Sequence, residues 1–280
     1  MKTIKNVVFT LLIIATISTH AQNHPFKVDI IGNGEPILLF PGFACTGEVW
    51  EETVLELSRN FECHVFTFAG FGNEPAIDRP WLPKIKEGIF NYISEKELDN
   101  PILMGHSLGG ALALWMATES KSFKKLIIVD ALASTGALMI PNFKSENLVY
   151  DSPYNQHLLK MGNIDFETLA LQMANGMATD KSTQEKIANW MIQADRKTYV
   201  YGYTDLLKLD LRTDLAKIMV PVTIFAATEP YGYEAVKSTY YSQYKELQEY
   251  TIEFANGASH FIMYDQPEWF LENLKTALNR

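Results

Sequence analysis

The chain has 280 residues, of which 47% are hydrophobic and 20% are charged, and its formal net charge is −9 at neutral pH. This composition is typical of a folded globular protein and excludes disordered and collagen-like chains, while a content of two cysteines excludes a small disulfide-stabilised scaffold. The acidic balance argues against a nucleic-acid partner, which would need a basic face, and against docking on anionic membranes.

The N-terminal residues 1–21 have the features of a secretory signal peptide. Two lysines precede an apolar run over Val7–Ile17, and small residues lead to a cleavage point at Ala21–Gln22. The run is shorter than the roughly 20 apolar residues that span a bilayer. We therefore expect cleavage there and a secreted or periplasmic protein without a stable membrane anchor, an uncleaved N-terminal anchor being the alternative.

Short apolar runs alternate with helical segments along the rest of the chain. The runs are continuous, as expected for strands buried on both faces, and the alternation predicts a parallel sheet with helices on both sides. The predicted strands are Ile37–Phe40, Cys63–Phe68, Ile102–Met104, Leu126–Val129, Val222–Ala226 and Tyr250–Phe254. The predicted helices are Thr46–Arg59, Trp81–Lys96, Gly109–Glu119 and Pro267–Leu278.

The two cysteines lie at opposite ends of this predicted sheet. Cys45 follows the C-terminal end of the first predicted strand, and Cys63 begins the next one after a returning helix. A strand length of roughly 17–20 Å separates such positions, whereas a disulfide needs Cα atoms within about 7 Å. We therefore expect two free cysteines.

One long stretch, residues 134–217, has no convincing strand. Helical spacing recurs over Asn163–Met177, Lys181–Asp195 and Tyr199–Leu209. The stretch begins at the C-terminal end of a strand, the edge where open α/β sheets bind ligands, so it can cover a site there. We predict a core of residues 22–133 and 218–280, with residues 134–217 forming a helical cap between the two segments.

The sequence Gly105-His-Ser-Leu-Gly109 matches G-x-S-x-G in the setting of a nucleophile elbow. A buried strand ends at Met104, and a strong helix covers Ala111–Thr118. The glycines allow close backbone approach around a strained serine, and the helix directs the positive end of its dipole toward it. Ser107 is therefore the predicted nucleophile, the alternative being a glycine-rich turn without chemistry.

A serine hydroxyl needs a base to become a good nucleophile, and His260 is the predicted base. It follows the predicted strand Tyr250–Phe254, so it lies at the same edge of the sheet as Ser107. The order of nucleophile before histidine also suits a Ser-acid-His arrangement. The other histidines beyond the leader lie near the N-terminus, at the opposite edge, beside the nucleophile or in the helical stretch: His24, His64, His106 and His157.

Two acids are candidates for orienting His260. Asp130 ends the strand Leu126–Val129 and Glu229 follows the strand Val222–Ala226, so both lie at the correct edge and precede the histidine. Asp130 is favoured because an unpaired carboxylate at the end of an apolar strand would be costly. Glu229 stands in a loop rich in Tyr and Gly, where it could equally be a surface acid.

An oxyanion formed at Ser107 would need two backbone N–H groups. One is expected from Leu108, the residue after the nucleophile, and the other from the loop after the first predicted strand. Pro41 in that loop has no N–H, and Gly42 allows the chain to turn sharply. Phe43 is therefore the predicted second donor.

The chain resembles α/β-hydrolase fold proteins throughout its mature sequence. The matching stretches are Phe40–Phe43, Phe68–Gly72, Gly105–Gly110, Leu126–Asp130, Asp210–Val222 and Ser259–Phe261. The resemblance implies an α/β-hydrolase fold, with a mostly parallel sheet flanked by helices and a helical cap inserted after the sixth strand.

The chain departs from the family pattern in two places. Pro41–Gly42 replaces the common His-Gly of the oxyanion loop, and Ala227–Pro230 stands where Gly-x-x-Asp is usual after the seventh strand. Haloalkane dehalogenases resemble the chain around Val129–Ala131 and place their acid after the sixth strand, which supports Asp130. They use an Asp nucleophile, however, and Ser107 argues against dehalogenation.

These residues predict a serine hydrolase that cleaves an ester-type bond of a small or medium, partly apolar substrate through an acyl-enzyme. A small molecule is the expected partner. No metal or organic cofactor is expected, because no cluster of His, Cys and carboxylate ligands appears in the sequence. The same triad also supports C–C bond hydrolysis, cofactor-free perhydrolysis, or ligand binding with little turnover.

Overall fold

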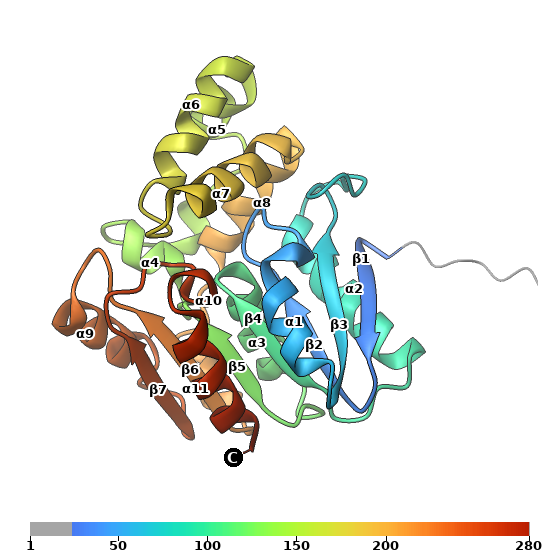
Figure 1. Cartoon of the computed structure of the whole chain (residues 1–280). Coiled ribbons are helices and arrows are strands. Elements are labelled where there is room, and N and C mark those ends of the chain that lie inside the picture. Colours follow the sequence, from blue (N-terminus) through green and yellow to red (C-terminus); the bar gives the residue numbers. More distant parts are fainter. Residues whose placement is uncertain (1–23, 280) are drawn as a thin grey trace, which may run out of the picture.

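A seven-stranded sheet forms the centre of the computed structural model, which describes residues 24–279 (Figure 1). The strands are β1 (Phe26–Gly32), β2 (Glu35–Phe40), β3 (Phe61–Phe68), β4 (Ile102–His106), β5 (Leu126–Val129), β6 (Val222–Ala227) and β7 (Tyr250–Ala255). Their order is β1-β3-β2-β4-β5-β6-β7, and every neighbouring pair is parallel except β1 and β3. The predicted signal peptide, residues 1–21, lies outside the described residues.

Helices connect the strands and cover both faces of the sheet (Figure 1). The α-helices are α1 (Glu51–Leu57), α2 (Trp81–Glu95), α3 (Leu108–Glu119), α4 (Thr135–Met139), α5 (Pro153–Lys160), α6 (Asn163–Ala174), α7 (Lys181–Gln193), α8 (Arg196–Lys208), α9 (Tyr233–Gln243), α10 (Ile262–Asp265) and α11 (Pro267–Asn279). Short 3-10 helices are η1 (Gly47–Trp50), η2 (Ser145–Asn147) and η3 (Asp214–Lys217). No helix within residues 24–279 is long and apolar enough to cross a membrane.

The central strands carry the hydrophobic core. Every residue of β4, β5 and β6 is buried, and so are the last four residues of β2. The helix α3 is apolar on almost all sides because it lies buried against β4 and β5. This arrangement confirms the α/β fold that the continuous apolar runs predict.

One edge of the sheet differs from the expectations. The antiparallel edge strand β1 was not expected, because the adjacent residues Ile30 and Ile31 interrupt the alternation of apolar and polar residues that marks a half-buried strand. Both side chains are exposed, with relative exposures of 49% and 44%. The helical stretch lies between β5 and β6, as predicted; β5 is the strand that the family pattern counts as the sixth.

Both cysteines are free and buried, as expected. Cys63 pairs with Ile37 near the start of β2, whereas Cys45 lies beyond the end of that strand. Burial raises the pKa of the Cys63 thiol to about 11.

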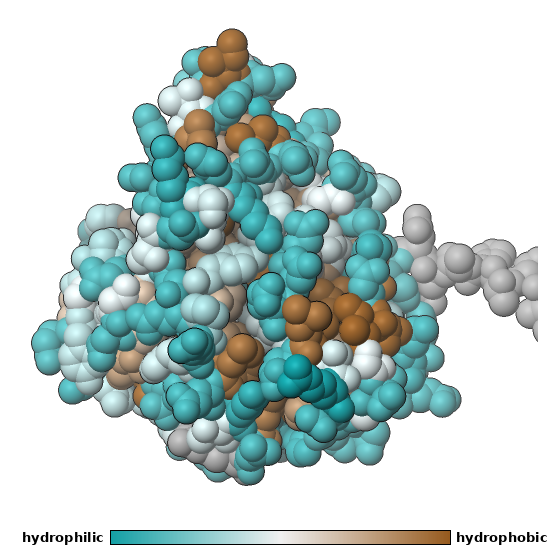
Figure 2. All heavy atoms as spheres, in the orientation of Figure 1, coloured by the Kyte–Doolittle hydropathy of each residue, from teal (hydrophilic) through white to brown (hydrophobic). Residues whose placement is uncertain are grey.

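The segment from α4 to α8 stands over the C-terminal edge of the sheet, and no strand interrupts it within the described residues (Figure 1). Helix α8 is fixed to α2 by Asp205, whose carboxylate accepts the N–H groups of Trp81 and Leu82 at the start of α2, at 2.7 and 3.0 Å. The face shown in Figure 2 is mostly hydrophilic, and its apolar atoms include some over α6, where Ile164 and Leu171 are exposed.

Candidate active site

Ser107 occupies a strained turn between β4 and α3. Its backbone has φ 52° and ψ −118°, a conformation that non-glycine residues rarely adopt. A Cβ on Gly105 would lie 2.2 Å from the Gly109 carbonyl oxygen, and one on Gly109 would lie 2.3 Å from that of Phe40. The two glycines are therefore needed for the tight strand-to-helix passage, and Ser107 remains partly exposed among buried neighbours.

Asp130 and His260 meet at the same edge of the sheet. Asp130 Oδ2 lies 2.6 Å from His260 Nδ1, and the two side chains are 14% and 29% exposed. Asp130 Oδ1 accepts the N–H of Ala227 at 2.9 Å and the hydroxyl of Tyr240 at 2.7 Å. Both carboxylate oxygens are thus held in place, and the second nitrogen of His260 is left for another partner.

Tyr240 on α9 is a member of this network that sequence reasoning missed. Burial and the nearby Asp130 carboxylate raise the pKa of Tyr240 well above its usual value of 10. The hydroxyl therefore stays protonated and donates its hydrogen to Asp130. Its position 110 residues away in the chain leaves no sequence signal for this contact.

Glu229, the alternative acid, lies apart from His260. It is exposed, its backbone N–H donates to the Ala258 carbonyl oxygen at 3.0 Å, and its carboxylate has no hydrogen bond or ion pair within residues 24–279. Of the two acids, only Asp130 contacts the histidine.

His106, the residue before the candidate nucleophile, also contacts His260. Its ring centroid lies 4.6 Å from that of His260 and 4.5 Å from that of Phe261. Burial, with the neighbouring His260 as a smaller cause, lowers the pKa of His106 well below 6.5, so this imidazole is neutral. The His106 ring therefore packs against the loop that carries His260.

The loop after β2 approaches Ser107 closely. A Cβ on Gly42 would lie 3.5 Å from Ser107 Cβ and 2.6 Å from His106 Nδ1, so the backbone can take this path only with glycine. The next N–H, that of Phe43, donates no hydrogen bond within the described residues. Leu108 is the first residue of α3, where a helical N–H has no intrahelical acceptor.

Aromatic residues of α8 cover the Phe43 ring. Tyr199 and Tyr203 each lie with ring centroids 5.2 Å from that of Phe43. Their hydroxyls donate only to sulfur, to Met173 at 3.5 Å and to Met139 at 3.4 Å. Burial raises the pKa of both tyrosines, so each hydroxyl stays neutral in a wall that is largely apolar.

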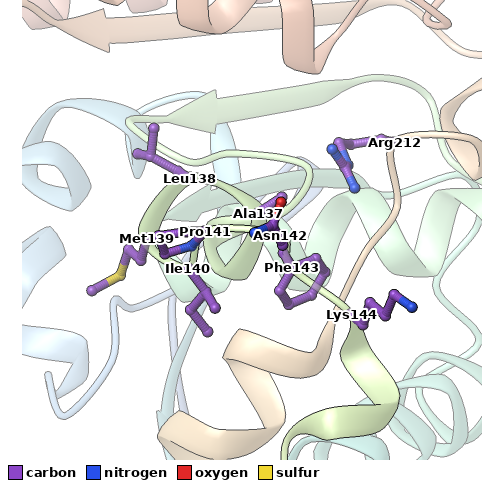
Figure 3. Close-up of a pocket in the computed structure, with 9 residues that line it drawn as sticks. All are labelled: Ala137, Leu138, Met139, Ile140, Pro141, Asn142, Phe143, Lys144 and Arg212. Atoms are coloured by element: carbon purple, nitrogen blue, oxygen red, sulfur yellow. The ribbon is translucent and has the colours of Figure 1, made fainter.

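A hollow of about 510 Å³ lies elsewhere, between the loop at residues 137–144 and Arg212 (Figure 3). None of the candidate residues Ser107, Asp130 and His260 lines it. The Arg212 guanidinium is already bound to Asp210 through bonds of 2.8 and 2.7 Å, so it is not a free cation for a ligand.

Comparison with known proteins shows one family match and several distant relatives. The model of the alpha/beta hydrolase family matches residues 37–273, which is most of the chain. A pimeloyl-acyl-carrier-protein methyl ester esterase of Vibrio cholerae is 22% identical over 69% of this chain and 75% of its own length. A 3-oxoadipate enol-lactonase of Acinetobacter baylyi is 20% identical over 91% of this chain and 93% of its own.

The solved structure of an enol-lactonase from Burkholderia xenovorans superposes with a TM-score of 0.77 and 16% identity. The superposition covers 91% of this chain and 96% of that one. At this identity the likeness shows a shared fold.

Proposed function

Since the chain belongs to the alpha/beta hydrolase family, we propose that it is a serine hydrolase that cleaves ester-type bonds through an acyl-enzyme. The observation that carries the proposal is the 2.6 Å contact of Asp130 with His260, at the sheet edge where Ser107 occupies a strained elbow. A serine, an imidazole and an orienting carboxylate are the three groups that nucleophilic acyl transfer requires.

In the acylation step, Ser107 Oγ attacks the ester carbonyl while His260 Nε2 takes its proton. The negative charge on the carbonyl oxygen is bound by the N–H groups of Phe43 and Leu108. The C–O bond to the alcohol then breaks, and the leaving oxygen receives the proton from His260. Asp130 holds the Nδ1–H tautomer throughout and stabilises the imidazolium form.

Deacylation repeats these roles with water as the nucleophile. His260 Nε2 accepts a proton from the water, whose oxygen attacks the acyl carbonyl at the same oxyanion position. The bond to Ser107 Oγ breaks, the proton returns to that oxygen, and a carboxylic acid leaves. The step needs no group other than the residues already named.

The substrate we propose is small or medium and partly apolar. Phe43, Tyr199 and Tyr203 form an aromatic wall over the oxyanion loop, and the two hydroxyls are turned to thioethers. Two relatives that cover about nine tenths of the chain are described as enol-lactonases, and a lactone is a cyclic ester. Lactones therefore join linear esters as candidate substrates.

A fluorophosphonate probe tests the proposal directly, because it labels only an activated serine. We expect the probe to label the wild-type protein but not Ser107→Ala. The control variant Ser94→Ala, which changes an exposed serine of α2, should also be labelled. A panel of p-nitrophenyl esters, lactones and amides of graded chain length then defines the substrate class. An unlabelled wild-type protein would contradict the hydrolase assignment and favour a ligand-binding role. Ester turnover by Ser107→Ala would contradict a mechanism with Ser107 as the nucleophile.

We also propose that residues 134–217 act as a cap over this site and that the protein is exported with removal of residues 1–21. The aromatic contacts of α8 with the oxyanion loop support the cap. N-terminal sequencing of protein recovered from the periplasm or the medium is expected to begin at Gln22. Recovery of the intact N-terminus at Met1 would contradict cleavage.

A further inference from the structure

The carboxylate of Asp265 joins the loop that carries His260 to the connection between α6 and α7. Its Oδ2 accepts the N–H of Ser259, the residue before the histidine, at 2.7 Å. Its Oδ1 accepts the N–H and the hydroxyl of Thr179, at 2.8 and 2.9 Å. One side chain therefore holds two segments that are about 80 residues apart in sequence.

A second hydrogen bond joins the same two segments on the other side of the histidine. The N–H of Phe261 donates to the Met177 carbonyl oxygen at 3.1 Å. In addition, the Lys186 ammonium on α7 lies 5.3 Å from the ring centroid of Tyr264 on α10. His260 is thus flanked by two residues, Ser259 and Phe261, whose backbone N–H groups depend on this junction.

Helices α6 and α7 have few other attachments to the sheet. They pack mainly against one another, and they meet α8 through Phe166, which lies 5.1 Å from Tyr199. Figure 1 shows the pair extending away from the sheet, with the α6–α7 connection close to α10. A displacement of the pair would therefore act on the Asp265 junction, next to the candidate base.

We propose that Asp265 is a positioning residue that couples the α6–α7 pair to His260, so that the position of this pair sets the orientation of the imidazole. The inference rests on the proposed hydrolase function. Asp265 itself does not touch the reacting atoms, and its effect passes through Ser259 to the histidine.

The chemistry of the junction suggests specific variants. Both oxygens of Asp265 accept hydrogen bonds from N–H groups, so Asp265→Asn must place an amide NH2 against one of these donors. Thr179→Val removes only the hydroxyl donor, and Thr179→Ser retains it. Thr168→Val is the matched control, because the Thr168 hydroxyl donates within α6, to the Ile164 carbonyl oxygen.

Two measurements distinguish positioning from general stabilisation. We expect Asp265→Asn to lower kcat for p-nitrophenyl acetate by about 10- to 100-fold, as a misplaced catalytic group does, while KM changes much less. Thr179→Val is expected to give a smaller loss of kcat that Thr179→Ser restores. The proton NMR signal of the His260 Nδ1–H should move in Asp265→Asn and Thr179→Val and stay in place in Thr168→Val.

The outcomes separate this inference from the proposed function. If fluorophosphonate labels the wild-type protein but kcat and the NMR signal are unchanged in Thr179→Val and Asp265→Asn, the coupling is wrong and the hydrolase assignment stands. The coupling would also be overturned if Thr179→Val and Thr168→Val lost kcat equally and in proportion to a fall in their melting temperatures. Should Asp265→Asn fail to fold, the comparison of the Thr179 variants still decides the question. A wild-type protein that is not labelled contradicts the proposed function itself.

Discussion

His106 donates a hydrogen bond from Nε2 to the main-chain carbonyl oxygen of His260, at 3.0 Å. Because a carbonyl oxygen can only accept a hydrogen bond, Nε2 of His106 carries the ring proton. The lowered pKa of this buried ring keeps the imidazole neutral, so Nδ1 carries no proton. That bare nitrogen faces Gly42, whose position leaves no room for a side chain. One neutral imidazole therefore lies between the loop of the proposed base and the loop of the proposed oxyanion hole.

Two substitutions at this position separate the hydrogen bond from the packing. His106→Gln keeps an amide N–H near the place of Nε2, and His106→Phe keeps a ring but no donor. We expect His106→Phe to lower kcat by about 10- to 100-fold, because the His260 backbone loses its anchor, and we expect His106→Gln to lose much less. Steady-state kinetics with p-nitrophenyl acetate measures the difference, and equal losses in the two variants would show that only packing matters.

The contrast between Asp130 and Glu229 gives a second prediction. Asp130→Asn is expected to lower kcat by about 10⁴-fold, because the new side chain cannot satisfy both partners of the carboxylate. If its NH2 group faces His260, it favours the wrong imidazole tautomer. If the NH2 group faces the other way, it opposes the Ala227 N–H. Glu229→Gln should leave kcat close to that of the wild-type enzyme, because its carboxylate is exposed. A large loss in Glu229→Gln with a small one in Asp130→Asn would reverse the assignment of the acid.

The sheet edge that carries the candidate site was predictable because parallel strands end together. Asp130 follows β5 and His260 follows β7, and both strands run parallel to β6, so the two residues had to lie at one edge of the sheet. Ser107 was predictable because glycines on both sides of a serine, between a strand and a helix, indicate a close turn. These are local patterns, and the fold follows from them.

The side-chain network around the site was not predictable, because it depends on contacts between distant segments. Tyr240 reaches Asp130 from α9, a helix that has no clear apolar face in sequence. His106 lies beside the nucleophile in the sequence, and only the structure shows that it binds the His260 carbonyl oxygen. Asp265 lies two residues before Pro267, and only the folded chain shows that it binds Ser259.

The two buried histidines with lowered pKa values predict how stability depends on pH. Burial lowers the pKa of both His64 and His106 below 6.5, so the unfolded chain binds protons that the folded chain does not. The free energy of unfolding is therefore highest above pH 6.5 and falls as the pH decreases below it, by up to about 1.4 kcal/mol per pH unit for each histidine.

Urea denaturation at pH 7.5 and 5.5 measures this dependence. His64→Asn keeps an acceptor for the Tyr92 hydroxyl, which lies 2.7 Å from His64 Nδ1, and is expected to reduce the loss of stability between the two pH values. His157→Asn on the exposed side of α5 is the surface control and should match the wild-type protein. An unchanged pH dependence in His64→Asn would show that His64 binds protons equally in the folded and the unfolded chain.

The last prediction concerns the backbone of Gly42. In Gly42→Ala the new Cβ would lie 2.6 Å from His106 Nδ1, so the loop must shift and displace the Phe43 N–H from the proposed oxyanion position. Because such a donor acts on the transition state, kcat is expected to fall by about 100-fold or more while KM changes little. Gly176→Ala is the matched control, since no atom lies within 4 Å of its added Cβ, and it should retain wild-type kinetics. Full activity of Gly42→Ala would mean that the loop after β2 does not supply the second donor.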